Sequence, residues 1–445
     1  MTRLTKVLLA TAVTSIMFGA HAQAASRAAL SCNAADVQNA INASQDGDTV
    51  MVPAGNCQWP FAVTIDKTIS VKGAGSGGGT TLVYSGADHS YFTVSVGNKT
   101  GYTEISGFFF DKPWLQTMTW QGLIQVYGPY GWKNFRFHHN RIRSYDRDWH
   151  LLIGTGTHAL IDHNTFEGQA GALMMKGNED YDWTTPLTLG SADFLFVEDN
   201  VFNFTPDGNQ YPVNDLQHGG RVVVRHNQII NAFFQTHDLM RNGYPSGHAY
   251  EIYENQFSNT VWLHKAIELN SGTGVIFNNA INGGWNYGIG LRDYRTAGPK
   301  VYNGTVDVKV CNGADPIDQN STTTGWRCQY QVGTHGFGST AMSYPLYVWN
   351  NTCDGADGGC SGGYQAAFAD DTIDYAFSNR PTSEHVVYGR DVINNGSTPK
   401  PGYTPYTYPH PLQSGGGSGG GGGNGGGGST PTGPATPSNL RLSAP

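Results

Sequence analysis

Histidine, acidic and basic side chains recur at similar places in short strand-like segments of the second half of the chain. Aligned by eye, these segments place His218, His237 and Glu268 on neighbouring strands, with Arg292 close by. A histidine ionises near neutral pH and can act as a general base. An arginine can hold a carboxylate through two parallel hydrogen bonds. Together they provide what β-elimination of a uronic acid requires: a base for the proton beside the carboxylate, and a cation for the carboxylate itself.

We therefore predict the active site of a polysaccharide lyase. The predicted catalytic residues are His237, which would be the base, Arg292 and His218. The predicted substrate-binding residues are Arg241, Gln235 and Asn270. Because Ca²⁺ prefers oxygen ligands, the predicted metal ligands are Asp238, Glu268 and Asp293. A calcium ion would also help an acidic protein to accept an acidic polymer.

Two other interpretations of the same residues remain open. A glycoside hydrolase uses two carboxyl groups across the bond that it cleaves, one of them protonated, and Glu268 with Asp293 could form such a pair. A non-catalytic surface module would instead bind glycans along a polar face, and the Gly-rich segment after Leu412 suits a tethered protein. The sequence contains no nucleotide-binding loop, zinc-ligand spacing or serine nucleophile motif.

The elements that would position these residues are indicated by a repeat. The pattern apolar-x-apolar-x-polar-Asn-x-apolar recurs with spacings of 24, 36, 27, 28, 24 and 72 residues, at Asn140, Asn164, Asn200, Asn227, Asn255, Asn279 and Asn351. A period in this range indicates a solenoid, and each unit begins with the period-two alternation of a strand. We predict an all-β, single-stranded, right-handed parallel β-helix in which these asparagines form a ladder at one corner.

The corner carries further expectations. Asparagine tolerates the left-handed backbone conformation, so we expect it to make the turn. The two residues before it should then lie on a solvated face, as for Arg225 and His226 before Asn227. The equivalent polar residues elsewhere are His138, His139, Asp162, His163, Glu198 and Asp199.

A second strand should precede each asparagine strand, so that matched side chains form columns on the outer face. The aligned segments are 123–128, 151–156, 186–191, 214–219, 233–238, 266–271 and 289–294. One column contains Tyr127, Thr155, Gly190, His218, His237, Asn270 and Asp293, and the other contains Gln125, Thr188, Gln235 and Glu268. An error of one residue in this alignment would turn side chains to the opposite face.

The two ends of the chain differ from the repeats. Residues 34–44 place Val37 and Ile41 four apart, which predicts a short helix capping the stack. Residues 25–412 would form the β-helix domain, and residues 413–445 a flexible Gly-rich tail. Residues 1–24 combine a positive start with an apolar run of 14 residues, which predicts a signal peptide. The mature protein should therefore be secreted, periplasmic or on the cell surface.

Charge and cysteine content fit this prediction. The formal net charge is −8 at pH 7, so the chain is not suited to nucleic acid or anionic membranes. We expect an extracellular polysaccharide as the partner, no membrane span in the mature chain, and a monomer. An even number of cysteines in an exported chain suggests disulfides. The pairs that close the shortest loops are Cys32–Cys57, Cys311–Cys328 and Cys353–Cys360.

The amphipathic cap, the asparagine corners and the signal sequence together resemble the pectin-lyase-like superfamily of right-handed parallel β-helix proteins. Finer motifs are similar to those of secreted bacterial β-helix repeat proteins of largely undefined activity. These motifs are LGSADFLFVEDNVF, GGRVVVRHNQI, YEIYENQF, YPLYVWNNT and YTYPHPL. The resemblance covers roughly residues 30–412 and implies the fold. The calcium-binding aspartates and the base of pectate lyases match no motif here, so the resemblance assigns no site residue.

Overall fold

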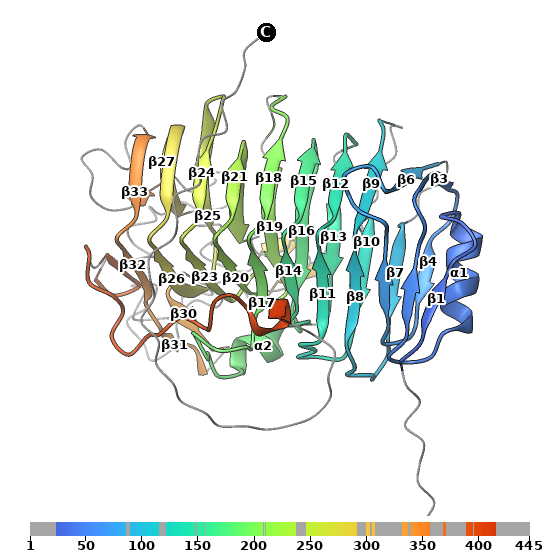
Figure 1. Cartoon of the computed structure of the whole chain (residues 1–445). Coiled ribbons are helices and arrows are strands. Elements are labelled where there is room, and N and C mark those ends of the chain that lie inside the picture. The colour runs from blue at the N-terminus through green and yellow to red at the C-terminus, as the bar shows by residue number, and fades with distance from the viewer. Residues whose placement is uncertain are drawn as a thin grey trace, which may run out of the picture.

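The chain winds into a right-handed parallel β-helix, whose coils stack along one axis in Figure 1. The computed structural model describes residues 24–414 apart from 86–89, 115–121, 147–148, 155, 208, 210, 237–245, 292–299, 303–304, 308–331, 337–339, 357–367, 371–388 and 395. Each complete coil contributes one strand to each of three parallel ladders. The predicted fold class is therefore confirmed.

The first ladder holds the strand that precedes each corner asparagine. Its strands are β1 (Ser26–Ala28), β2 (Thr49–Met51), β5 (Ser70–Lys72), β8 (Thr103–Ser106), β11 (Phe135–His138), β14 (Leu160–Asp162), β17 (Leu195–Glu198), β20 (Arg221–Arg225), β23 (Ala249–Tyr253), β26 (Thr273–Phe277), β32 (Leu346–Trp349) and β35 (Val392–Asn394).

The second ladder follows the corner. Its strands are β3 (Gly55–Trp59), β6 (Thr80–Tyr84), β9 (Phe108–Lys112), β12 (Arg141–Ser144), β15 (Thr165–Gly168), β18 (Val201–Phe204), β21 (Gln228–Ile230), β24 (Gln256–Ser258), the first part of β27 (Ala280–Leu291) and β33 (Thr352–Ala356).

The third ladder completes each coil. Its strands are β4 (Val63–Ile65), β7 (Phe92–Ser95), β10 (Ile124–Tyr127), β13 (Trp149–Ile153), β16 (Gly171–Lys176), β19 (Tyr211–Gln217), β22 (Ala232–Thr236), β25 (Leu263–Leu269), the second part of β27 and β34 (Phe368–Asp370). The remaining strands form two antiparallel pairs, β28 (Lys300–Tyr302) with β29 (Thr305–Asp307), and β30 (Thr334–His335) with β31 (Met342–Ser343).

A short helix closes the amino-terminal end of the stack, as predicted. Helix α1 (Ala34–Ala43) buries Val37 and Ile41 against the first coils. The Cys32–Cys57 disulfide, with 5.7 Å between the Cα atoms, fastens this helix to strand β3. Cys353 is also disulfide-bonded. The other cysteines of the two remaining predicted pairs lie outside the described residues, which leaves those pairings as predictions.

The predicted asparagine ladder is present at one corner. From Asn140 to Asn351, each side-chain Nδ2 donates to the Oδ1 of the asparagine in the next coil, over 2.8–3.2 Å. The backbone N–H of each also donates to that oxygen, as from Asn227 to Asn255 over 3.1 Å. The members joined in this way are Asn140, Asn164, Asn200, Asn227, Asn255, Asn279 and Asn351.

The turn itself differs from the prediction. The residue in the left-handed conformation is the one before each ladder asparagine, with φ between 51° and 58°. These residues are His139, His163, Asp199, His226, Glu254, Asn278 and Asn350. The asparagine follows this turn because its amide must point into the ladder, where it is at most 3% exposed.

The prediction that Arg225 lies on a solvated face is wrong. Arg225, Glu198 and Asp162 are fully buried, although all three were expected to face solvent beside the corner. The cover is a C-terminal strap, residues 396–414, which ends in the 3-10 helix η2 (Pro411–Ser414) and crosses the first ladder in red in Figure 1. A second apolar cluster, outside the interior of the coils, packs beneath this strap.

The alignment of the third ladder also needs one correction. Segment 186–191 is not a strand, and β16 takes the place that was assigned to it. Thr188 and Gly190 therefore leave the predicted columns. The observed outer column contains Gln125, Leu152, Met174, Asp215, Gln235 and Glu268, so three of the four predicted members were correctly aligned. The inserted residues 177–193, which include helix α2 (Asp180–Thr184), form a loop beside this face.

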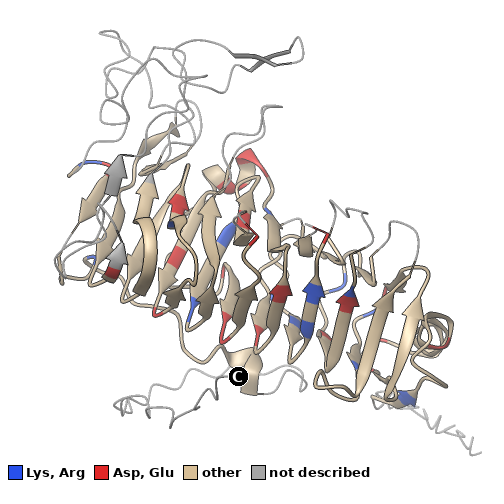
Figure 2. Cartoon of the chain, turned by 90° about the horizontal axis from the view of Figure 1, so that it is seen from above, with Lys and Arg blue, Asp and Glu red and all other residues tan. Residues whose placement is uncertain are grey.

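Within the part of the chain described above, no helix is long and apolar enough to cross a membrane. Most of the predicted signal peptide precedes that part. Figure 2, viewed from above, shows acidic and basic residues interspersed along the coils instead of gathered by sign. The molecule thus presents no single-sign field along this view that would steer a polyanion to it.

Candidate active site

The predicted site residues fall into two groups. His237, Asp238, Arg241, Arg292 and Asp293 lie outside the described residues, so their roles remain predictions. The described members are His218, Gln235, Glu268 and Asn270. His218 lines a cavity at the carboxyl end of the third ladder, whereas Gln235 and Glu268 belong to a polar cluster farther along the same outer face. Asn270 donates to Thr236 at the end of β22.

The cavity has a volume of about 560 Å³ and lies over the ends of three strands. Its walls combine rings, charges and backbone from Tyr127, Gly154, Lys176, Gly177, Asn178, Glu179, Asp180, Tyr181 and His218. Tyr127 ends β10, Lys176 ends β16, and His218 follows β19 directly. Because these strands lie within four consecutive strands of one parallel ladder, β10, β13, β16 and β19, residues distant in sequence meet at their carboxyl ends.

The strand register brings Lys176 and His218 to the same end of the ladder. Lys176 pairs with Gln217, the residue before His218, and both Lys176 and His218 line the cavity. The Tyr127 ring lies on Gly154 of the next coil, where a Cβ atom would come within 2.9 Å of the ring. A residue larger than glycine at 154 would therefore displace this ring from the cavity wall.

His218 and Glu179 face one another in this cavity. The His218 Nδ1 and Glu179 Oε1 atoms are 3.6 Å apart, and the side chains are 14% and 47% exposed. The Glu179 backbone N–H also donates to the His218 carbonyl over 2.7 Å. Glu179 is therefore tied to His218 through its backbone, and its carboxylate lies beside the imidazole.

Asp182 anchors the loop that carries Glu179. It is 1% exposed and accepts hydrogen bonds from the Tyr130 hydroxyl and the Asn178 backbone N–H. Burial raises the pKa of Asp182 above its ordinary value, and burial with the nearby Asp182 also raises the pKa of Tyr130. At the other end of α2, the Arg221 guanidinium donates to the carbonyls of Asp182, Thr185 and Pro186 over 2.7–2.9 Å.

A second polar cluster follows along the outer face. Asp215 accepts hydrogen bonds from the Gln217 and Gln235 amides over 2.6 and 3.0 Å. Two strands farther along the ladder, Glu268 lies 3.6 Å from the Lys265 ammonium group. Asp215 and Glu268 are only 2% and 7% exposed. The cluster is thus more enclosed than the cavity, in which Tyr181 and Glu179 are open to solvent.

Calcium binding remains a prediction. Two of the three expected ligands, Asp238 and Asp293, are not among the described residues. Within the described ranges, no group of three or more His, Cys, Asp or Glu side chains has the arrangement of a metal site. Glu268 is the one expected ligand with a described environment, and there it faces Lys265.

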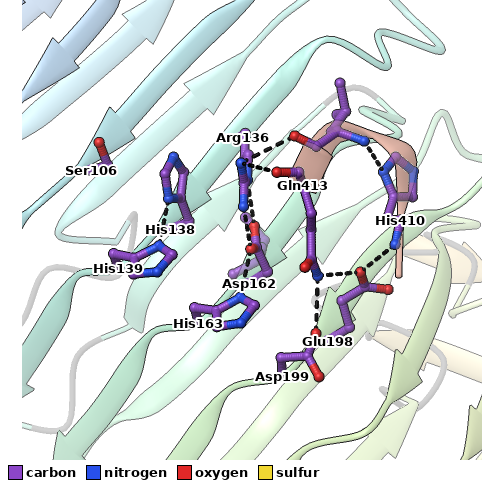
Figure 3. A network of polar contacts seen from close by, with 12 residues as sticks. Ser106, Arg136, His138, His139, Asp162, His163, Glu198, Asp199, His410 and Gln413 are labelled. Atoms are coloured by element: carbon purple, nitrogen blue, oxygen red, sulfur yellow. Dashed lines mark hydrogen bonds and ion pairs between the residues drawn. The ribbon is translucent and has the colours of Figure 1, made fainter. Parts of the chain in front are cut away.

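The strongest polar network of the first ladder is structural. Figure 3 shows Arg136 paired with Asp162, and Glu198 accepting from His410 and Gln413 of the strap. Arg136 also donates to the Leu412 carbonyl over 3.1 Å. These groups hold the strap onto the solenoid and are enclosed by it. Burial lowers the pKa of His410 to about 4, so this histidine is neutral at physiological pH.

Sequence reasoning missed Lys176, Glu179 and Asp215. The first two follow from the overlooked strand β16 and the loop after it. The spacing of 36 residues between Asn164 and Asn200, longer than the neighbouring 24 and 27, was the signal that a loop is inserted in this coil. Asp215 lies within segment 214–219, but the alignment put His218 where the register places Gln217, so this segment was wrong by one residue and Asp215 was not recognised as a member of the column.

Comparison with known proteins adds a similarity of fold. No protein-family model and no curated protein matches this sequence. Among solved structures, the chain is similar to a PL6 family polysaccharide lyase from Pseudopedobacter saltans. The TM-score is 0.36 and the sequence identity 13%, over 87% of this chain and 94% of that one. A likeness this distant says nothing about the site, which must be argued from its own geometry.

Proposed function

We propose that the protein is a polysaccharide lyase that cleaves a uronic-acid-containing polymer by β-elimination. The observation that carries this proposal is the joint lining of one cavity by Lys176, His218 and two tyrosine rings, Tyr127 and Tyr181. An ammonium group can neutralise the substrate carboxylate, and an imidazole can accept the proton next to it. Aromatic rings offer flat apolar surfaces to the faces of sugar rings.

The reaction assigns one task to each group. His218 Nε2 accepts the proton from the carbon beside the carboxylate, while Lys176 stabilises the negative charge that develops on that carboxylate. The electron pair of the broken C–H bond forms a carbon–carbon double bond. The glycosidic C–O bond breaks at the same time, and the protonated His218 returns the proton to the departing oxygen. The products are a shortened chain and a chain with an unsaturated uronate end.

The polar cluster fits a glycoside hydrolase less well. Asp215 and Glu268 share a column two strands apart, roughly 9.6 Å along the axis. A hydrolase needs one carboxyl group that holds a proton at the start of the reaction. Here Asp215 accepts from two amides, and Glu268 faces an ammonium group. Both carboxyl groups thus contact side chains of the protein itself, which does not favour their use on opposite sides of a glycosidic bond.

A substrate panel tests the proposal. The purified protein should be incubated with polygalacturonate, alginate, chondroitin and neutral glucans, with calcium and with a chelator. The proposal predicts new ultraviolet absorbance from unsaturated uronate ends on at least one acidic polymer and none on neutral glucans. New reducing ends without this absorbance would indicate a hydrolase, and binding without turnover a glycan-binding module. Either result would refute the lyase.

A further inference from the structure

We infer that Glu179 is a positioning residue that orients the His218 imidazole, and that the loop holds its backbone in a strained conformation for this purpose. The inference deepens the proposed function, since it concerns the same cavity and rests on His218 as the base. It differs from that proposal because it assigns a role to a residue that need not touch substrate.

Backbone strain singles out Glu179. Ten non-glycine residues have a positive φ among those described, and seven of them precede a ladder asparagine. The remaining three are Asn231, His218 and Glu179. Asparagine tolerates this conformation, so the two exceptions without such a reason are His218, with φ 54°, and Glu179, with φ 51°. These two residues are also the pair that face each other in the cavity.

The backbone of Glu179 is more strained than its positive φ alone implies. Its ψ of −133° places it outside the left-handed helical region that non-glycine residues occasionally adopt. A conformation of this kind persists only where the surroundings over-determine it, and such positions cluster at functional sites. Neighbouring residues hold Glu179 in this conformation.

Hydrogen bonds fix the backbone on both sides of Glu179. Before it, the Asn178 backbone N–H donates to buried Asp182. After it, Arg221 fixes the end of α2 through three carbonyl oxygens. Glu179 itself is tied by its backbone N–H to the His218 carbonyl over 2.7 Å. Gly177 makes the close approach possible, because a Cβ atom there would lie 2.4 Å from the Asp182 Oδ2 atom.

The chemical consequence concerns the direction of the imidazole. The Glu179 carboxylate lies 3.6 Å from Nδ1, beyond hydrogen-bonding distance, so it acts on the ring through its negative charge. A carboxylate beside the ring also stabilises the imidazolium that forms when the base accepts a proton. Glu179 would thereby raise the basicity of His218 and aim it into the cavity.

An NMR titration of His218 tests this coupling without any need for turnover. The imidazole signal is assigned by its loss in His218→Ala, and its titration is compared between the wild type and Glu179→Gln. The titration midpoint of His218 should be lower in Glu179→Gln, because a negative charge beside the ring has been removed. An unchanged midpoint would overturn the inference, even if lyase activity were found; a lower midpoint would support it even if no substrate were found.

A glycine substitution separates strain from function. Glu179→Gly should relieve the backbone and raise the unfolding temperature, while turnover falls by at least tenfold and the acidic limb of the pH profile shifts to lower pH. The matched control is Glu254→Gly, because Glu254 has φ 56° and also pairs with a histidine, His226, over 3.0 Å at a ladder corner. That control should leave turnover unchanged. A Glu179→Gly protein with a lower unfolding temperature, or with full turnover, would contradict the inference.

Discussion

Arg225 and Glu198 form an ion pair with 2.5 Å between Nη2 and Oε2, and neither side chain is exposed to solvent. Arg225 also donates to the carbonyls of Tyr406 and Thr407, over 2.7 and 2.9 Å, and Glu198 accepts from the His410 backbone over 2.8 Å. The pair thus links two neighbouring coils to the C-terminal strap. The strap adds hydrogen bonds to both charged groups and shields them from solvent.

Loss of one partner should therefore be costly. Arg225→Ala would leave the Glu198 carboxylate buried without its cation, which destabilises proteins by about 3–5 kcal/mol. Urea denaturation followed by circular dichroism measures this difference. The control is Arg141→Ala, which breaks a partly exposed pair with Glu167 and should cost at most about 1 kcal/mol. Equal losses in the two variants would show that the strap does not enclose the Arg225–Glu198 pair.

The asparagine ladder makes a second prediction. Asn227→Ala should lower the free energy of unfolding by roughly 1–3 kcal/mol, because it removes the side-chain donor to the Val197 and Arg225 carbonyls and the acceptor of the Asn200 backbone N–H. Asn203→Ala, on an exposed position of β18, should stay within about 0.5 kcal/mol of the wild type. A ladder variant as stable as this control would refute the structural role of the corner.

The repeat made most of the fold predictable. The Asn227 pattern combines a strand, a corner and an apolar return within eight residues, so each coil can be recognised from a short stretch of sequence. The strap could not be predicted in this way, because Tyr406 meets Arg225 across 181 residues of sequence. A polar side chain beside a corner looks the same in sequence whether solvent or a distant segment covers it.

The site was only partly predictable for a similar reason. Gln125, Gln235 and Glu268 could be aligned because each lies in a strand followed by a clear corner motif. Strand β16 was missed because the segments were aligned by their distance to the next asparagine motif, and the inserted residues 177–193 lengthen that distance, so 186–191 was chosen instead. Lys176 and Glu179 belong to that overlooked strand and its loop, so neither was predicted as a site residue.

Glu251 gives the stability of the protein a pH dependence. Its carboxylate is fully buried and accepts from the Gly190 N–H and the Tyr403 hydroxyl over 2.6 and 2.5 Å. Burial raises the pKa of Glu251 from 4.5 to about 7. The folded state therefore binds this proton more tightly than the unfolded chain, so its stabilisation is complete below pH 4.5 and is lost as the pH rises through 7.

Glu251→Gln should remove this dependence. Relative to the variant, the wild type should lose about 3 kcal/mol of stability between pH 4.5 and pH 8, since one pKa unit corresponds to about 1.4 kcal/mol. Urea denaturation at several pH values measures the difference between the two curves. Parallel curves over this range would mean that Glu251 is not held in a low-dielectric environment beneath the strap.

The central claim is most directly tested by the rate at which unsaturated uronate ends form on the best acidic polymer. His218→Ala should lower kcat/KM by about 10²–10⁴ while leaving the unfolding curve unchanged, because a general base contributes that much to the rate. His226→Ala, at a ladder corner against Tyr408, should leave kcat/KM as in the wild type. Wild-type rates in His218→Ala, or equal losses in both variants, would contradict the assignment of this cavity as the active site.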